Sequence, residues 1–270
     1  MRVGLCFVLL SSLLSAQKKR KDPEASLPSA AGPDSTTIRI VQQAVRLQNP
    51  LTRTYPLHSG ADSIAIRIYQ QAVRYQDPLI KIYALHYRIA REGPSFALLD
   101  TLAQAYFEAG FYKQAISVAD ELLSQQPRNA ALAELKALSY YYLQDLKKAI
   151  EAYENLYEIT SEPLHLYQVI TMQFNLQRYG ECQANIDKLL SLPEAARAQV
   201  RITTPDGQTQ SVPLQAAAYN VRGVIFRLQK DYPRAREAFE KALQIAPDFL
   251  LARGNLEDMQ KETAPPGKKN

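Results

Sequence analysis

Apolar and small residues recur every three or four positions along most of the chain, which is the spacing of one face of an α-helix. Residues 217–247 show the pattern most clearly. Two helical faces follow one another there, formed by Tyr219, Gly223 and Phe226 and then by Ala235, Phe239, Ala242 and Leu243. The stretch between them ends in Pro233, which suits the first turn of a helix because its missing N–H has no partner there. The pattern therefore predicts two short antiparallel helices that approach closely at Gly223 and Ala235.

The same pattern returns upstream at a fixed period. Tyr106 and Tyr140 stand 34 residues apart, and Ala115 and Ala149 are separated by the same distance. A third, weaker unit follows, in which Cys182 takes the alanine position one residue short of the period. An ordinary helical bundle has no reason to keep a fixed period. The sequence therefore predicts an all-α stack of about four hairpins over residues 95–262.

This pattern resembles the tetratricopeptide repeat (TPR), which runs W-x2-L-G-x2-Y, then A-x3-F, then P over about 34 residues. Tyr219, Gly223 and Phe226 stand where the repeat has its tryptophan, glycine and tyrosine. Its second half is matched by Ala235, Phe239 and Pro247, whereas Arg222 replaces the leucine of the first half. The resemblance implies a TPR solenoid, which is a right-handed superhelix of stacked helical hairpins.

An insertion of about 19 residues interrupts the period between the third and fourth units, judged against the repeat length. Val200 and Ile202 alternate with polar residues, and residues 205–207 (Pro-Asp-Gly) have turn chemistry. Val212 lies on the return strand. We therefore expect a β-hairpin near residues 198–213. It is either a surface excursion that the stack tolerates or part of a binding surface.

Residues 37–94 contain a local duplication. The segment that starts at Ile38 is repeated from Ile66 at an offset of 28 residues, and His58 returns as His86. The second copy predicts a helix that ends before Pro78 and another that ends before Gly93. We interpret the pair as an N-terminal cap on the stack. A shared copy explains both histidines, so they predict no metal site.

The two ends of the chain differ in composition from the rest. Residues 1–16 have a charged start, an apolar core over 3–14 and small residues before Gln17, which is typical of a secretory signal peptide. Residues 17–36 and 263–270 are polar or proline-rich without apolar periodicity, and predict a disordered spacer and a disordered tail. Residues 249–262 predict an amphipathic helix that caps the last hairpin. No stretch predicts a membrane span.

Composition and charge narrow the range of functions. The formal net charge is +5, with much of the excess at the two ends, which argues against nucleic acid as a partner. If the signal peptide is removed, Cys182 has no cysteine to pair with, and its small-residue position predicts a buried, unreactive thiol. The sequence contains no G-x-S-x-G, H-E-x-x-H, phosphate-binding glycine loop or paired-cysteine motif. We therefore expect no enzymatic activity, cofactor, metal or small-molecule substrate.

The resemblance also implies a binding groove, because in this family the first helix of each hairpin lines a concave surface that receives a peptide or helix. Some members grip a carboxylate there with Lys and Asn, but Asp100 and Glu134 stand at the lysine positions here, so this clamp is not expected. Rigid aromatic residues are typical binding anchors. The repeat register predicts a groove lined by Gln104, Phe107, Leu138, Tyr141, Tyr142, Tyr167, Phe174, Asn220 and Arg227.

These features predict a non-enzymatic scaffold of the cell envelope, most readily the periplasm, that binds an extended peptide or a helix of another protein in its groove. The alternative is a fixed structural subunit of an envelope assembly or secretion complex, held through the convex face or the β-hairpin. The two hypotheses differ in one respect: groove substitutions are silent in the second.

Overall fold

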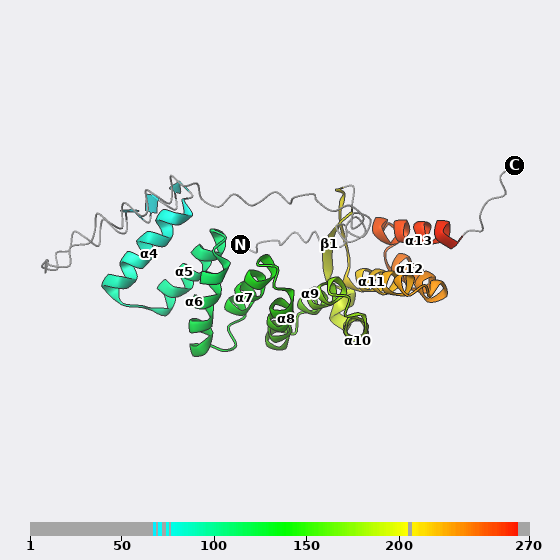
Figure 1. The fold of residues 1–270 in the computed structure, drawn as a ribbon, viewed down its shortest axis with the longest axis horizontal. Helices are drawn as coiled ribbons and strands as arrows, with labels where there is room; N and C mark the ends of the chain where they lie inside the picture. Colours follow the sequence, from blue (N-terminus) through cyan, green and yellow to red (C-terminus); the bar gives the residue numbers. More distant parts are fainter. Residues whose placement is uncertain (1–66, 69, 72–73, 76, 205–206, 264–270) are drawn as a thin grey trace, which may run out of the picture.

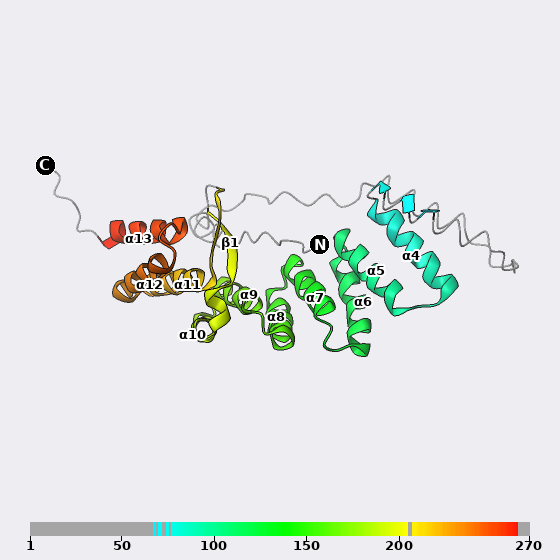
Figure 2. The ribbon, with the colours of Figure 1, turned by 180° about the vertical axis from the view of Figure 1, so that it is seen from behind.

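A computed structural model describes residues 67–263, apart from residues 69, 72–73, 76 and 205–206. Its helices follow one another in hairpins along the longest axis of the molecule, with α4 near one end and α13 near the other (Figure 1). The view from behind shows the same order (Figure 2). The predicted all-α stack with one β-hairpin insertion is confirmed. The predicted signal peptide, the spacer, the first copy of the duplication with His58, and residues 264–270 of the tail lie outside the described residues.

Each repeat is one helical hairpin, and the helices before and after the repeats close the stack. The four hairpins are α5 (Phe96–Glu108) with α6 (Tyr112–Gln125), α7 (Ala130–Tyr142) with α8 (Leu146–Thr160), α9 (Pro163–Asn175) with α10 (Tyr179–Leu190), and α11 (Leu214–Leu228) with α12 (Tyr232–Ile245). The flanking helices are α4 (Pro78–Glu92) and α13 (Leu250–Thr263). We call α5, α7, α9 and α11 the first helices and α6, α8, α10 and α12 the second helices.

Short polar side chains start several of these helices. The Ser95 hydroxyl accepts a hydrogen bond from the backbone N–H of Leu98, and the Asn129 side chain accepts one from Leu132. Asp145 and Asp231 cap the second helices α8 and α12 in the same way. Such caps satisfy N–H groups that the helix itself leaves unpaired, which explains why the hairpins begin where they do.

The turn inside each hairpin has the same backbone conformation in all four repeats. Gly110, Gln144, Gln177 and Lys230 occupy equivalent positions and have φ values of 78°, 60°, 59° and 62°. In each case the next residue donates a backbone hydrogen bond to a carbonyl five residues earlier, as Asp231 does to Phe226 at 2.9 Å. This left-handed turn is a standard helix ending that favours glycine. The sequence shows it only at Gly110.

Replacing Gln144, Gln177 and Lys230 by glycine should therefore stabilise the stack. A non-glycine residue in the left-handed region destabilises the folded state by about 1 kcal/mol or more. Glycine removes this strain but also raises the conformational entropy of the unfolded chain, which offsets part of the stabilisation. We expect the free energy of unfolding to rise by about 0.5 kcal/mol per substitution, measured by urea denaturation. Gln125→Gly, inside the last turn of α6, is the control and should lower it.

Small residues let the two helices of a hairpin approach each other. A Cβ atom added to Gly223 in α11 would lie 2.5 Å from Cε1 of Phe239 in α12, so the predicted close approach is confirmed. In the preceding hairpin Cys182 is buried, and its thiol donates a hydrogen bond to the carbonyl oxygen of Ile170 at 3.4 Å. Burial raises the pKa of the Cys182 thiol to about 12. The thiol therefore stays protonated and packs as a small residue, as predicted.

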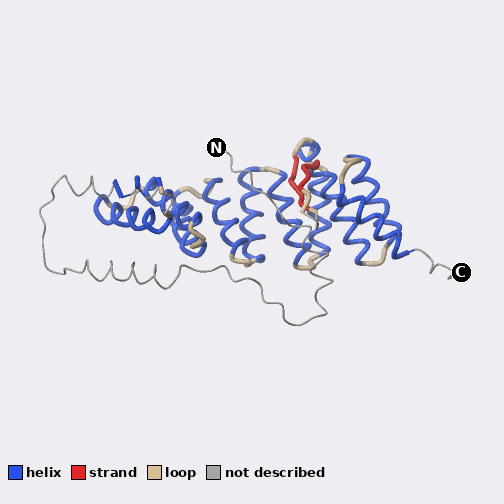
Figure 3. Tube along the Cα trace, turned by 90° about the horizontal axis from the view of Figure 1, so that it is seen from above, coloured by secondary structure: helices blue, strands red, loops and turns tan. Residues whose placement is uncertain are grey.

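The insertion forms a 3-10 turn, η1 (Pro193–Ala196), and an antiparallel hairpin of β1 (Gln199–Thr203) and β2 (Thr209–Pro213). Val200 faces Val212 across the pair, and both are buried in the same core cluster as α11. Viewed from above, the strands lie over the helical stack (Figure 3). The Gln210 side chain accepts a hydrogen bond from the N–H of Leu250 at 3.1 Å and donates one to the carbonyl of Asp248 at 2.8 Å. The hairpin is thus packed on the stack and attached to the turn before α13.

The C-terminal helix α13 covers the last hairpin, as predicted. A buried hydrogen bond of 2.9 Å joins the Asn255 amide to the Asn220 carbonyl oxygen in α11. Near the other end of α13, the Glu262 carboxylate accepts two hydrogen bonds from the guanidinium of Arg227. Among the described residues, no helix is long and apolar enough to span a membrane.

At the N-terminal end, α4 packs on α5 through Ile82 and Leu85. His86 and Tyr106 share a hydrogen bond of 2.6 Å between Nε2 and Oη, and the Lys81 ammonium pairs with Glu108 at 2.7 Å. The described part of the second copy thus joins the stack through apolar packing and two polar interactions. His86 acts here as a packing residue of the cap.

Candidate functional site

The first helices form the inner side of the stack. At two junctions they approach one another directly, α5 with α7 and α9 with α11, and α13 approaches α11 in the same way. In a curved stack of hairpins the helices on the inside of the curve come closest together. The inner surface therefore runs along the exposed face of the first helices, where the repeat register placed the groove.

Four aromatic rings gather on this surface at the first two hairpins. Phe107 lies at the end of α5, Tyr112 at the start of α6, and Tyr141 and Tyr142 at the end of α7. The rings of Tyr112 and Tyr142 are stacked, with centroids 5.1 Å apart and an interplanar angle of 13°. Phe107 packs edge-on against both, at 5.6 Å and 5.8 Å. We call these four residues the aromatic cluster.

The aromatic cluster is partly open to solvent. The Tyr142 side chain is 46% exposed, and the other three rings are half-buried. Desolvation raises the pKa of Tyr112 and of Tyr141, and the neighbouring Tyr142 phenol adds to both shifts. The Tyr112 and Tyr141 phenols are therefore neutral at physiological pH, and the rings of the cluster offer rigid apolar faces. This is the chemistry of an anchor for a peptide or a helix rather than of a reacting group.

The structure brings together three of the nine predicted groove residues, Phe107, Tyr141 and Tyr142. Gln104 lies one turn before Phe107, is exposed, and donates a hydrogen bond of 3.1 Å to Asp100. Tyr112 was missed, because the register assigns it to a second helix and no signal in the sequence brings it to the end of a first helix.

The other predicted groove residues are not exposed as the register implied. Leu138, Tyr167, Phe174 and Asn220 are all buried, with exposed fractions of 7%, 3%, 6% and 0%. Leu138 packs in the core cluster of the second hairpin, and Tyr167 and Phe174 belong to that of the last two. Arg227 is half-buried and is held by Glu262. The spacing of residues along a helix predicts the face on which a residue lies. It does not predict how deeply neighbouring elements bury that residue.

Several buried polar atoms of α9 and α11 have no hydrogen-bond partner among the described residues. They are the Tyr167 hydroxyl, the Gln168 amide nitrogen, the Asn175 carbonyl oxygen and the Asn220 amide nitrogen. A buried polar group without a partner costs about 1–3 kcal/mol. The inner helices therefore hold two amide NH2 groups, one carbonyl oxygen and one hydroxyl that are buried without a partner.

No arrangement suited to metal chemistry is found in the described ranges: no group of three or more His, Cys, Asp or Glu side chains there could hold a metal ion. His165 is buried and hydrogen-bonded to Thr160 through Nδ1 at 2.9 Å. The polar side chains of the inner helices include amides, phenols, the carboxylate of Asp100 and the guanidinium of Arg227.

Comparison with known proteins settles the family. A model described as "Tetratricopeptide repeat" matches residues 216–249, and a second model of the same description matches residues 101–162. The chain contains tetratricopeptide repeats. The two matched ranges cover the second hairpin and most of the first and fourth, and the third hairpin continues the stack in the structure.

Relatives and solved structures agree with the TPR fold. The chain is 31% identical over 133 residues to "Intraflagellar transport protein 70B" of Rattus norvegicus, a match that spans 49% of this chain and 17% of that protein. A tetratricopeptide repeat protein from Parabacteroides merdae has a TM-score of 0.52 at 19% identity, covering 75% of this chain and 73% of its own. A crystal structure of MamA protein has a TM-score of 0.51 at 13% identity, covering 78% and 99%. These structures share the fold.

Proposed function

We propose that this TPR protein is a non-enzymatic scaffold that binds an extended segment or a helix of another protein along its inner surface. The aromatic cluster carries the proposal. It exposes a tyrosine that is stacked and therefore held in place, beside half-buried rings that form an apolar floor. Tyrosine and phenylalanine lose little conformational entropy on binding, which makes such a group a suitable anchor.

We further propose that the chain acts outside the cytoplasm, in the cell envelope and most readily the periplasm. Support comes from the sequence of residues 1–16, where an apolar core follows a charged start and ends in small residues. A basic, polar stretch follows at once, which is typical of the beginning of a mature chain. Cleavage after Ala16 would leave Gln17 as the first residue, and mass spectrometry of the chain purified from cells would show it.

Affinity capture from envelope extract tests the binding proposal, with the wild-type chain and Tyr142→Ala used side by side. We expect at least one captured protein to be depleted about tenfold or more by the substitution, which corresponds to about 1.4 kcal/mol for an exposed anchor. The purified partner should then show the same loss in a titration followed by calorimetry. Tyr142 is exposed, so its removal should leave the fold intact.

Tyr75→Ala is the matched control, because Tyr75 is also an exposed tyrosine, 71% exposed, but lies before α4 and outside the aromatic cluster. Its capture profile should equal that of the wild type. If both variants retain every partner, the inner surface is not the binding site, and the alternative of a fixed subunit held by the convex face or the β-hairpin is favoured.

A further inference from the structure

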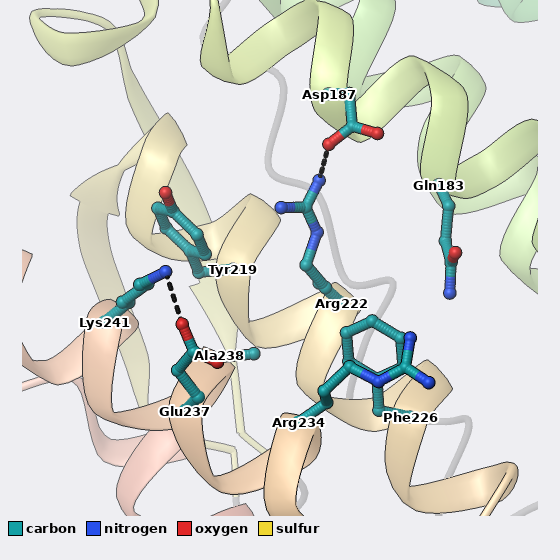
Figure 4. A pocket seen from close by; sticks show the side chains of 9 residues that line it. All are labelled: Gln183, Asp187, Tyr219, Arg222, Phe226, Arg234, Glu237, Ala238 and Lys241. Carbon is teal, nitrogen blue, oxygen red and sulfur yellow. Dashed lines mark hydrogen bonds and ion pairs between the residues drawn. The ribbon is translucent and has the colours of Figure 1, made fainter. Parts of the chain in front are cut away.

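A small pocket opens between the second helices α10 and α12, with α11 as its floor. Three cationic side chains line it, Arg222, Arg234 and Lys241, together with the rings of Tyr219 and Phe226. Figure 4 shows the cationic side chains converging on the opening from α11 and α12, with Asp187 above it on α10. The pocket shares no lining residue with the aromatic cluster, which lies on α5, α6 and α7.

The cations of this pocket are held by aromatic rings and by exposed carboxylates. Arg222 and Lys241 flank the ring of Tyr219 at 5.7 Å and 5.8 Å from its centroid. Arg222 pairs with Asp187, whose side chain is 73% exposed, and Lys241 pairs with Glu237 at 2.7 Å. Exposed ion pairs of this kind contribute only about 0–1 kcal/mol. A carboxylate from another molecule could therefore replace these acids at little cost.

The same arrangement occurs at the junction of the first two hairpins. There a second pocket is lined by Lys136, Tyr140, Lys148, Glu151 and Ala152. Each of these stands 86 residues before its counterpart among Arg222, Phe226, Arg234, Glu237 and Ala238.

The interactions within the two pockets repeat as well. Lys148 lies over the ring of Tyr140 at 5.6 Å, as Arg234 lies over Phe226 at 5.0 Å. Lys136 crosses to Asp120 of the preceding hairpin at 2.6 Å, as Arg222 crosses to Asp187. The arrangement thus occurs at two hairpin junctions, although the second pocket has Ala133 and Asn155 where the first has Tyr219 and Lys241.

The size and charge of the pocket at α12 indicate what it accepts. Its volume is about 210 Å³, below the roughly 300–1,000 Å³ of pockets that hold small-molecule ligands, and enough for one side chain. Its lining has three cations and the carboxylates of Asp187 and Glu237, and Arg234 also pairs with Asp231, outside the lining, at 2.6 Å. A planar guanidinium binds a carboxylate through two parallel hydrogen bonds. We propose that this outer pocket receives an aspartate or glutamate side chain from an acidic segment of a partner protein.

A fluorescein-labelled hexaglutamate peptide tests the outer pocket by fluorescence anisotropy at low ionic strength. We expect Arg222→Ala to weaken binding about tenfold, because it removes the guanidinium. Asp187→Ala should strengthen binding several-fold, because it removes the carboxylate that competes for Arg222. If the ion pair between Arg222 and Asp187 had only a structural role, the two substitutions would change the affinity for the peptide in the same direction. Arg222→Lys, which keeps the charge without the planar fork, should fall between wild type and Arg222→Ala.

The controls separate the pocket from net charge and from the inner surface. Arg236→Ala removes an exposed cation of α12 outside the pocket lining and should leave binding unchanged. Tyr142→Ala should also leave it unchanged, so failure here and failure of the inner-surface proposal are distinguishable. If Arg222→Ala lowers the melting temperature, Lys241→Ala, at a residue with 48% side-chain exposure, replaces it. Equal weakening by Arg222→Ala and Arg236→Ala, or weakening by Asp187→Ala, overturns the proposal.

Discussion

Gly223→Ala should destabilise the protein by about 1–3 kcal/mol, the usual range for inserting a methyl group into a filled core. The new Cβ would lie 2.5 Å from Cε1 and 2.6 Å from Cδ1 of Phe239, far inside van der Waals contact. The Phe239 ring cannot move away, because it is completely buried between the helices of the last hairpin. Urea denaturation followed by circular dichroism gives the loss, and hydrogen exchange should show it concentrated in α11 and α12.

Gly254→Ala is the matched control. The same methyl group added in α13 meets no atom within 4 Å. Alanine is the better helix former by about 1 kcal/mol, so this substitution should stabilise the protein. The same change from glycine to alanine should therefore lower the free energy of unfolding at residue 223 and raise it at residue 254. A second test removes the clash instead: Phe239→Leu should lose less stability in the Gly223→Ala background than in the wild type. Equal effects of the two glycine substitutions would refute the close approach.

Phe249→Ala should cost about 3–5 kcal/mol, which is typical of deleting a buried phenylalanine. Phe249 is completely buried in the turn between α12 and α13 and belongs to the core cluster that contains the β-hairpin and α11. Its ring therefore packs in one core with several elements. Removing it should expose the amides of α13 and of both strands to hydrogen exchange, while α5 to α8 stay protected, because each repeat contacts mainly its neighbours.

Leu250→Ala is the control. Leu250 follows Phe249 directly but is 40% exposed, so its substitution should change the free energy of unfolding by less than about 0.5 kcal/mol. If Phe249→Ala instead melts the whole stack in one transition, the repeats are more strongly coupled than a nearest-neighbour model allows. If it changes nothing, the β-hairpin and α13 do not depend on this anchor. Hydrogen exchange of the amides in α5 to α8, compared with that in the β-hairpin and α13, distinguishes these outcomes.

The aromatic cluster shows where prediction from the repeat register ends. The register placed Phe107, Tyr141 and Tyr142 on the inner face of first helices, and the structure finds them in one cluster. The same rule placed Tyr167 and Asn220 there, and both are buried. Tyr112 joins the cluster across a turn whose left-handed residue, Gly110, folds the start of α6 back onto the end of α5.

The sequence by itself determined the period, the helical hairpins, the β-hairpin insertion and the small residues at the helix crossings. These follow from local spacing and residue size, which act over one or two turns of a helix. Only the tertiary structure decided which inner residues stay exposed, that Arg222 and Lys136 reach acids in the preceding hairpin, and that the insertion packs on α11. Those facts depend on distances between segments up to 40 residues apart, such as Gln210 and Leu250. Such distances are established when hairpins bury their apolar faces against each other, and the helical periodicity of the sequence does not predict them.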